Sequence, residues 1–524
     1  MKTANTLHKQ LPRHIDRAPA LTTRFPGRPA LAASMWLGDH ALRLIGPRYN
    51  AFMWVVTHAR PATLDWFSQL RAERAASHAG RRVPAYQAFL RDGVATETVE
   101  LGSRTVPTTD KASYVQRYPV AARCRDGVLP TSGVTIDESS GSSGTPFNWV
   151  RLERERRVTH LFIAHFARYC FGAGPFITIN AFSMGAWATG VNMAVALERN
   201  SVVKSTGPDV DKIFRTLELF GTSQPYLICG YPPFLKHLID HAQTTGFPLG
   251  DYRLMGLVGG EGMSEGLRDY LTPTFQPVYS GYGATDIEIG LAGETPLSVA
   301  IRRLARDDED VRRALFGDDP RLPMLFQYNP LQHHISVSDA GELIFTINRL
   351  DVLAPRIAYN IHDEGGILRY DEALERLGAL GVDLNGLTDA TRPVRFPFVW
   401  VHGRKDSTVS VMGANLYPED VEQALYAAPD LAALTHSFCL SLSERADGGV
   451  RPCFAFEVTA EITPAIQAAF EEHIIAGVHA LNADFREALI EHPASATPLI
   501  QLYPLGTGPF AADAGRIKQT RLVR

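Results

Sequence analysis

Apolar and polar positions alternate in a regular order along residues 175–282. The apolar runs FITINAF, SVVKS, PYLICGY and LMGLVGG are short, which predicts strands. Between them, DVDKIFRTLELF and PPFLKHLIDHAQTT repeat apolar residues at helical spacing. Strands that alternate with helices predict a layered α/β sheet, whose ligands bind where the strands end.

The pattern changes after this region. Beyond Gln327 it becomes rich in strands (HHISVSD, GELIFTINRL, FPFVWVHGR), with an inserted helix at YDEALERLGALGV, and after Asp406 a smaller α/β pattern follows. Helical spacing is predicted for 51–110. We therefore predict an α/β protein with a large N-terminal region of layered α/β subdomains plus a β-rich subdomain, and a small α+β C-terminal domain. The predicted parts are an N-terminal arm over 1–50, a main domain over 51–404 and a C-terminal domain over 405–524.

Composition narrows the class of protein. The 524 residues are 45% hydrophobic and 21% charged, as in ordinary globular proteins, and a net charge of -4 offers no attraction to nucleic acid or an anionic membrane. Five scattered cysteines without a CxxC pair argue against a disulfide scaffold or a structural zinc site. No run reaches the about 18 apolar residues of a membrane span. The basic N-terminal stretch predicts a loosely ordered arm rather than a transit peptide, and a cytoplasmic location is the default expectation.

The stretch ESSGSSGTPFNWVR, residues 138–151, allows two interpretations. Gly/Ser runs are typical of flexible linkers. Its flanks, however, predict a strand at GVTIDE and a long helical segment starting near FNWV, and a Gly/Ser turn between a strand and a helix can bind phosphate. The Walker pattern GxxxxGK[ST] is missing, which disfavours a P-loop NTPase.

Four further motifs follow the Gly/Ser stretch in order. They are LVGGEGMSEGLRDYL, VYSGYGATDIEIG, PRIAYNIHDEGG and HGRKDSTVSVMGANLYPEDVEQAL, and the chain ends in GRIKQTRLVR. Their order and spacing resemble the acyl- and aryl-adenylate-forming enzymes, closest to the phenylacetate-CoA ligase-like branch. The resemblance covers the chain from about Val83 onward. It implies ATP and Mg²⁺ as cofactors, a carboxylic acid as substrate, and CoA or an acyl carrier protein as partner.

The resemblance assigns nucleotide-binding roles to several motif residues. The resemblance makes the Gly/Ser stretch a phosphate loop, whose hydroxyls and glycines approach phosphate oxygens. The family often has a lysine where this chain has Thr145, so other groups must neutralise the phosphate charge. Tyr282 with Gly283 resembles the adenine-stacking motif, Thr285 the catalytic phosphate-contacting hydroxyl, and Asp286 the usual Mg²⁺-binding glutamate, with Glu288 as a second candidate metal ligand. The loop and adenine-wall residues are Ser139, Ser140, Gly141, Ser142, Ser143, Gly144, Thr145, Gly260 and Glu261.

The later motifs imply the ribose site and a moving domain. Asp363 resembles the ribose-binding aspartate, and Arg404 suits ribose and phosphate oxygens. Asp406 matches the hinge about which the mobile C-terminal domain rotates, and Gly413 would then lie on the path of the incoming thiol. The catalytic lysine near the terminus corresponds to Lys518, and Arg516 can share or replace its role.

The acid pocket is expected at the strand ends. The candidate side chains hint at an aromatic or otherwise flat acid; they are Phe182, Met184, Trp187, Tyr231 and Tyr279. The main hypothesis is an AMP-forming acid:CoA ligase. One alternative keeps adenylation but passes the acyl group to a carrier-protein thiol or another nucleophile. A second alternative is a catalytically silent nucleotide-binding protein.

Overall fold

The structure is a computed structural model, and it divides into two compact units, Met1–Met53 and Trp54–Arg524. The unit from Trp54 contains every feature discussed below. The residues that the structure describes are 38–93, 97–138, 147–185, 188–319, 321–383, 386–387, 393–404, 409–411, 414–444, 450–491, 493–513 and 521–522.

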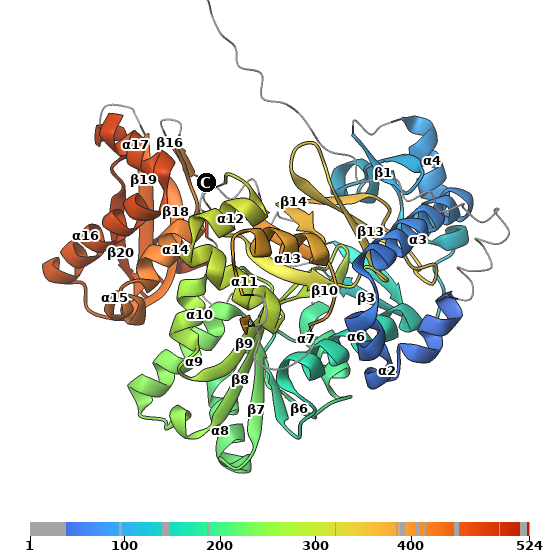
Figure 1. Ribbon diagram of the computed structural model, residues 1–524. Helices are drawn as coiled ribbons and strands as arrows, with labels where there is room; N and C mark the ends of the chain where they lie inside the picture. The colour runs from blue at the N-terminus through green and yellow to red at the C-terminus, as the bar shows by residue number, and fades with distance from the viewer. Residues whose placement is uncertain are drawn as a thin grey trace, which may run out of the picture. The chain divides into compact units, whose positions relative to one another are not determined.

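An 11-stranded sheet forms the centre of the larger unit (Figure 1). The half from β9 to β6 is parallel, and every pair from β9 to β12 is antiparallel. In spatial order its strands are β12(His333–Val337), β13(Glu342–Ile347), β14(Tyr359–Leu368), β15(Phe398–Arg404), β11(Met324–Tyr328), β10(Glu288–Gly293), β9(Phe275–Ala284), β8(Arg253–Gly259), β7(Pro225–Gly230), β5(Ile177–Asn180) and β6(Val202–Ser205). The predicted α/β and β-rich parts therefore share one sheet.

The helices of this unit and the turns between them match much of the predicted pattern. The helix predicted at PPFLKHLIDHAQTT is confirmed as α9, and that at YDEALERLGALGV as α13. The bounds are α2(Tyr49–His58), α3(Pro61–Arg82), α4(Pro84–Asp92), η1(Lys111–Val115), α5(Val120–Arg123), η2(Arg125–Gly127), α6(Glu153–Phe171), α7(Ala188–Leu197), α8(Val210–Phe220), α9(Pro232–Thr245), η3(Leu249–Asp251), α10(Glu265–Leu271), α11(Pro296–Asp307), α12(Glu309–Phe316) and α13(Tyr370–Ala379).

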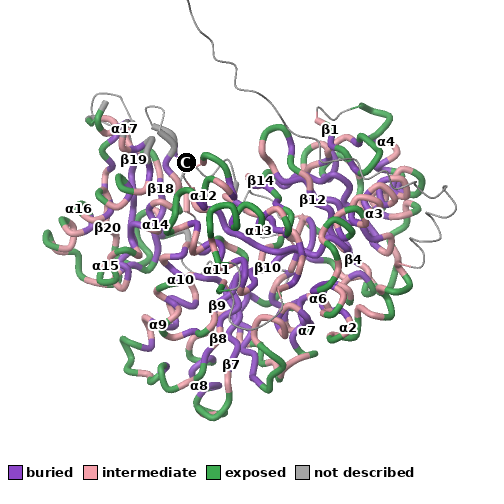
Figure 2. Tube along the Cα trace, in the orientation of Figure 1, coloured by how far each residue is buried: buried purple, intermediate pink, exposed green. Residues whose placement is uncertain are grey.

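Helices cover both faces of the parallel strands, which explains why these strands read as continuous apolar runs (Figure 2). In β7, Ile228 faces a cluster that includes α8 and α9. Its neighbours Leu227 and Cys229 face the opposite cluster, which includes α6 and α7. All three are fully buried, and each large side chain buried in this way contributes about 1.5–3 kcal/mol.

The C-terminal part is a smaller α+β layer. A hairpin, β16(Val409–Val411) with β17(Ala414–Leu416), precedes a three-stranded sheet of β18(Thr435–Glu444), β19(Val450–Val458) and β20(Leu499–Pro504). Its own apolar core joins Phe454 and Phe456 to Phe470 and Ile474. The helices are α14(Pro418–Tyr426), α15(Pro429–Leu434), α16(Pro464–Leu481), α17(Ala483–Glu491) and α18(Pro493–Ala496), with a short turn η5(Gly508–Asp513). The predicted fold class is thus confirmed.

Two local predictions are wrong. Residues 98–107 are not helical but form a hairpin of β1(Thr98–Leu101) and β2(Arg104–Pro107). The Gly/Ser stretch does not lead into a helix either, because β3(Val134–Glu138) pairs with β4(Asn148–Leu152) and α6 begins only after β4. Strand β4 forms because Trp149 and Val150 are buried against tertiary neighbours, which overrides the helical spacing downstream.

Candidate active site

A cavity of ≈ 520 Å³ opens beyond the carboxyl ends of β8 and β9, where an α/β sheet is expected to bind its ligand. Residues from the N-terminal region and from α14 in the C-terminal part surround it. Its lining comprises Lys111, Thr189, Tyr231, Gly260, Glu261, Gly262, Met263, Ser264, Glu265, Gly281, Tyr282, Gly283, Ala284, Thr285, Asp286, Ile289, Arg302, Arg321, Leu322, Met324, Phe326, Ile361, Asp363, Val401, His402, Gly403, Pro418, Glu419, Asp420, Glu422, Gln423, Phe438 and Arg521.

The predicted adenine wall lies on this cavity. Gly260 has a φ of 86°, a left-handed conformation that suits glycine, and it turns the chain out of β8. The strands are also unusually close here, since a Cβ on Gly259 would lie 2.9 Å from the carbonyl oxygen of Gly281. Gly260 and Glu261 therefore line the cavity directly after the strand ends.

Tyr282 and Asp363 meet across the cavity, although 81 residues separate them. The Tyr282 hydroxyl donates a hydrogen bond of 2.6 Å to Oδ2 of Asp363. The Tyr282 ring stacks on Phe326 with centroids 5.4 Å apart, which fixes the plane of the ring. Asp363 is paired with Arg404 in the register of β14 and β15, but the side chain of Arg404 lies outside the described part. An aromatic ring and a carboxylate thus stand together on the cavity.

Thr285 and Asp286 follow the end of β9 at the same cavity. The backbone carbonyls of Thr285 and Asp286 accept hydrogen bonds from Arg151 and Arg356, at 2.6 and 2.7 Å respectively. Oδ2 of Asp286 accepts a hydrogen bond of 3.1 Å from the Tyr359 hydroxyl. These contacts hold the backbone of the turn and direct the carboxylate of Asp286 toward the cavity wall.

Lys111 is a cavity residue that sequence reasoning missed. Its ammonium nitrogen lies 3.6 Å from Oδ2 of Asp286 and 4.9 Å from the ring centre of Phe147, the first described residue after the Gly/Ser stretch. It begins η1, whose preceding residue Asp110 accepts a hydrogen bond from the backbone of Ser113. In sequence this segment has only the signature of a capped turn, so nothing distinguished the lysine.

Glu288 does not line the cavity. Its carboxylate is buried, pairs with Arg349, and lies 2.8 Å from Nε2 of His333. Burial alone would raise its pKa, but Arg349 and His333 lower it below the usual range. Glu288 is therefore a buried, charged partner of Arg349. Of the two predicted metal ligands, Asp286 is the one that lines the cavity. Among the described residues no group of three or more His, Cys, Asp or Glu could hold a metal by itself.

A smaller apolar slot of ≈ 80 Å³ adjoins the cavity. Its walls come from α6, α7 and the strands β8, β9 and β10. The lining comprises Phe162, Ile163, Phe166, Phe182, Thr189, Met193, Leu257, Val258, Gly259, Gly260, Gly281, Tyr282, Gly283, Ile289, Gly290 and Ala292. Six of these also line the cavity, namely Thr189, Gly260, Gly281, Tyr282, Gly283 and Ile289, so the slot opens into it.

Of the five predicted acid-pocket residues, the structure brings Phe182 and Tyr231 together. Phe182 lines the slot and Tyr231 lines the cavity, with their rings edge to face at 5.3 Å. Tyr279 packs against Phe171 instead and lines neither space. The side chain of Met184 is 41% exposed, and Trp187 lies outside the described residues.

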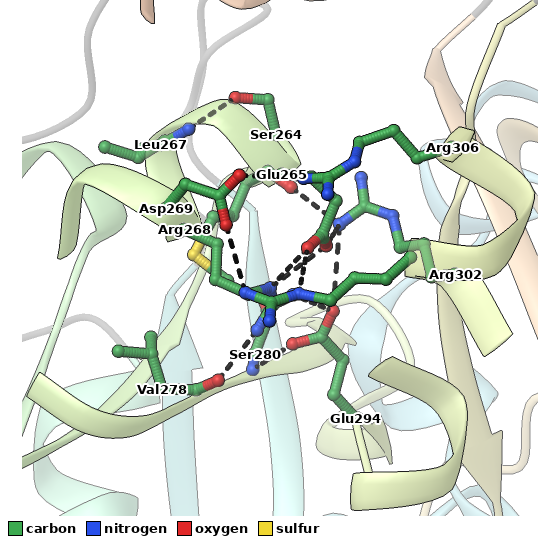
Figure 3. Close-up of polar contacts among 12 residues, drawn as sticks. Ser264, Glu265, Leu267, Arg268, Asp269, Val278, Ser280, Glu294, Arg302 and Arg306 are labelled. Carbon is green, nitrogen blue, oxygen red and sulfur yellow. Dashed lines mark hydrogen bonds and ion pairs between the residues drawn. The ribbon is translucent and has the colours of Figure 1, made fainter. Parts of the chain in front are cut away.

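A buried ionic network borders the cavity (Figure 3), and its members Glu265 and Arg302 also line it. Glu265 and Glu294 are paired with Arg268 and Arg302, and all four side chains are at most 3% exposed. Arg302 also donates a hydrogen bond of 2.9 Å to the carbonyl oxygen of Met263. The network therefore ties the loop after β8 to α10 and α11, and no local sequence signal revealed it.

The C-terminal part touches the N-terminal region through polar contacts near the cavity. Nζ of Lys236 in α9 donates a hydrogen bond of 2.8 Å to the carbonyl oxygen of Thr435, where β18 begins. It donates a second hydrogen bond of 2.6 Å to the carboxylate of Asp240. The backbone nitrogen of Ser264 donates a hydrogen bond of 3.3 Å to the carboxylate of Glu422 in α14. Together the contacts hold α14 over the adenine-wall loop.

Several predicted site residues lie outside the described part of the chain. They are the Gly/Ser stretch Ser139, Ser140, Gly141, Ser142, Ser143, Gly144 and Thr145, together with Asp406, Gly413, Arg516 and Lys518. In the part of the chain that the structure describes, no helix is both long and apolar enough to cross a membrane.

Comparison with known proteins gives structural matches only. No protein-family model and no curated protein matches the sequence. A crystal structure of 2-hydroxyisobutyryl-CoA ligase in the postadenylation state, in complex with R3-HIB-AMP, is similar with a TM-score of 0.64 at 12% identity, covering 90% of this chain and 91% of that one. The same ligase in complex with 2-HIB-AMP and CoA, in the thioesterification state, gives a TM-score of 0.50 at 13% identity over 90% and 91% of the two chains. The fold of this chain is that of the solved 2-hydroxyisobutyryl-CoA ligase structures.

Proposed function

We propose that the protein activates a carboxylic acid with ATP through an acyl-AMP intermediate and then transfers the acyl group to CoA. The observation that carries this proposal is the continuity of two spaces. One presents Tyr282 and Asp363, which suit adenosine, and the other is an apolar slot that suits the tail of an acid. Their shared mouth is where the carboxylate and the α-phosphate would meet. The 2-hydroxyisobutyryl-CoA ligase of the same fold binds an acyl-AMP adduct and CoA, which supports the proposal.

In the first half-reaction a carboxylate oxygen attacks the α-phosphorus of ATP, and pyrophosphate leaves. Tyr282 would stack on adenine and Asp363 would accept the ribose hydroxyls, with Arg404 as a further donor. Thr285 would contact the α-phosphate, and Lys518 or Arg516 would offset the charge that develops as carboxylate meets phosphate. Positioning of this kind supplies much of the acceleration in phosphoryl and nucleotidyl transfer.

The phosphate charge needs several positive groups. The Gly/Ser stretch Ser139–Thr145 would supply hydroxyls and backbone amides, and it lacks a lysine. Lys111, beside Phe147, is placed to supply the missing positive charge. Mg²⁺ is commonly held by one or two carboxylates together with phosphate oxygens, so the single carboxylate of Asp286 fits it as the protein ligand. When bound, the ion would neutralise charge on the phosphates.

In the second half-reaction the sulfur of the pantetheine thiol attacks the acyl carbonyl carbon, and AMP leaves. Exchanging pyrophosphate for a thiol favours a second arrangement of the C-terminal domain. Asp406 would be the hinge, and Gly413 would lie beside the pantetheine path. A carrier-protein thiol or another nucleophile remains the alternative acceptor, and the phenylacetate-CoA ligase-like branch remains the proposed relationship.

The central test is ATP–pyrophosphate exchange with a panel of acids, followed by CoA, a phosphopantetheinyl carrier and amines as acceptors for the best acid. We expect acid-dependent exchange and CoA thioester formation. Exchange without transfer to CoA would reassign the acceptor. ATP binding without exchange for any acid would favour a silent nucleotide-binding protein. Replacing Ser142 and Ser143 by alanine, or Gly144 by valine, should impair ATP-dependent turnover; unchanged kinetics in all three would restore the linker interpretation.

Measuring the half-reactions separately tests domain alternation. Lys518→Ala should slow adenylation, because it removes the charge that stabilises the reacting phosphate. Gly413→Leu should slow thioester formation, because a side chain would narrow the thiol path. Asp406→Pro should restrict φ at the hinge and change the two rates by different factors. If all three variants lower both rates equally, rotation about Asp406 is wrong.

A further inference from the structure

The apolar slot is uncharged as far as the described residues line it. Among them, no Asp, Glu, Lys, Arg or His side chain contributes to the lining. Hydroxyl groups come from Thr189 and Tyr282, and both residues also line the cavity, so they lie at the mouth. The Tyr282 hydroxyl is directed to Asp363. A charged tail would therefore be buried without a partner, which is strongly unfavourable.

The volume of the slot limits the length of the tail. The slot measures ≈ 80 Å³. An apolar protein cavity of about 150 Å³ binds benzene, and one water occupies about 30 Å³ of liquid. The slot thus has about half the volume of that benzene-binding cavity. A phenyl ring does not fit this volume, whereas a short aliphatic chain does.

One wall of the slot is formed by Ile163 and Phe166 of α6, which packs closely against β10. A Cβ on Gly293 would overlap the ring of Phe166, and a Cβ on Gly290 would lie 2.7 Å from Ile163. These two side chains therefore rest directly on the strand backbone. Because protein interiors are close-packed, the wall cannot retreat without moving the helix. Phe166, the bulkier of the two, takes up the most space along this wall.

We propose that the substrate is a short aliphatic monocarboxylic acid with an uncharged tail, and that Phe166 sets the limit on its length. This inference rests on the proposed function. It departs from the expectation of an aromatic or otherwise flat acid, because the slot is too small for a phenyl ring.

The test uses the full chain in pyrophosphate exchange with acetate, propionate, isobutyrate, hexanoate, benzoate, phenylacetate and succinate. We expect kcat/KM to be highest for propionate or isobutyrate. A methylene group that does not fit changes kcat/KM by about 10–200-fold, so hexanoate and benzoate should be at least 10-fold poorer. Succinate should also fail, because its second carboxylate would be buried.

Phe166→Ala should shift the preference toward hexanoate or phenylacetate by at least 10-fold, with the KM for ATP unchanged. Phe171→Ala is the matched control, because Phe171 lies on the same helix but packs on Tyr279 away from the slot. Should Phe166→Ala fail to fold, Met193→Ala on the facing helix α7 tests the same wall.

Three results would overturn the inference in whole or in part, and they are distinguishable. If the unmodified protein prefers benzoate, phenylacetate or succinate, the proposed activity holds but the assigned acid class is wrong. If no acid supports exchange although ATP binds, the proposed function itself fails. An unchanged acid preference in both Phe166→Ala and Met193→Ala would remove Phe166 as the limiting residue.

Discussion

Replacing Glu294 by glutamine should lower the free energy of unfolding of the N-terminal region by about 3–5 kcal/mol, the usual cost of leaving a buried charge without its partner. The Glu294 side chain is fully buried, pairs with Arg268, and accepts a hydrogen bond of 2.7 Å from the backbone nitrogen of Ser280. The buried centre contains two carboxylates, including Glu265, and two guanidinium groups, including Arg302. Removing one carboxylate leaves one uncompensated positive charge.

The pKa of Glu265 gives a second measure of the same coupling. Burial alone would raise the pKa, but Arg302 and Arg268 lower it from 4.5 to about 2. At about 1.4 kcal/mol for each pKa unit, this shift corresponds to about 3 kcal/mol. The value expected for Glu294→Gln and the value from the pKa of Glu265 are of the same order of magnitude. We therefore expect that breaking the network destabilises the fold around the cavity.

Urea unfolding followed by tryptophan fluorescence isolates the relevant region, because all six tryptophans precede residue 405. The matched control is Glu153→Gln, since the Glu153–Arg157 pair is 62% and 66% exposed. Exposed pairs contribute about 0–1 kcal/mol. Glu294→Asp keeps the charge and should fall between the two. If Glu294→Gln costs no more than Glu153→Gln, the network does not stabilise the fold as argued.

Four further predictions follow from the site. Asp363→Ala should weaken ATP binding by about 2–5 kcal/mol, as hydrogen bonds to a carboxylate are lost, whereas Tyr282→Phe should cost less; calorimetry on both variants checks the order. Lys111→Met should weaken ATP binding more than AMP binding, because we propose that its charge offsets that of the outer phosphates; an equal loss for both nucleotides would contradict that role. Lys236→Met should speed amide hydrogen exchange in residues 435–444 and leave 177–180 unchanged, because it removes the donor to the first carbonyl of β18; equal exchange in both segments would count against this tie. Because the pKa of Glu265 is lowered to about 2, its stabilisation is present above pH 4.5 and lost as pH falls toward 2; Glu265→Gln should flatten that part of the stability curve, and an unchanged slope would exclude the residue as its source.

Local sequence patterns were enough to predict the fold class and most of the strands and helices around the parallel half of the sheet. Continuous apolar runs between amphipathic helices predicted the parallel strands, since a strand covered on both faces has no polar side. The same pattern placed the Gly259–Glu261 motif at the end of a predicted strand, and this motif lies on the cavity. These inferences succeed because periodicity and turn chemistry act over a few neighbouring residues.

Contacts between side chains from distant segments could be seen only in the tertiary structure. The contact between Tyr282 and Asp363, the burial of Glu288 against Arg349, and the position of Lys111 beside Asp286 depend on strand order and pairing across distant segments. The hairpin that encloses the Gly/Ser stretch likewise depends on cross-strand pairing, which local helical spacing cannot reveal. The dimensions of the slot follow from how closely α6 packs on the glycines of β10, a contact between helix and strand that has no signature in either segment alone.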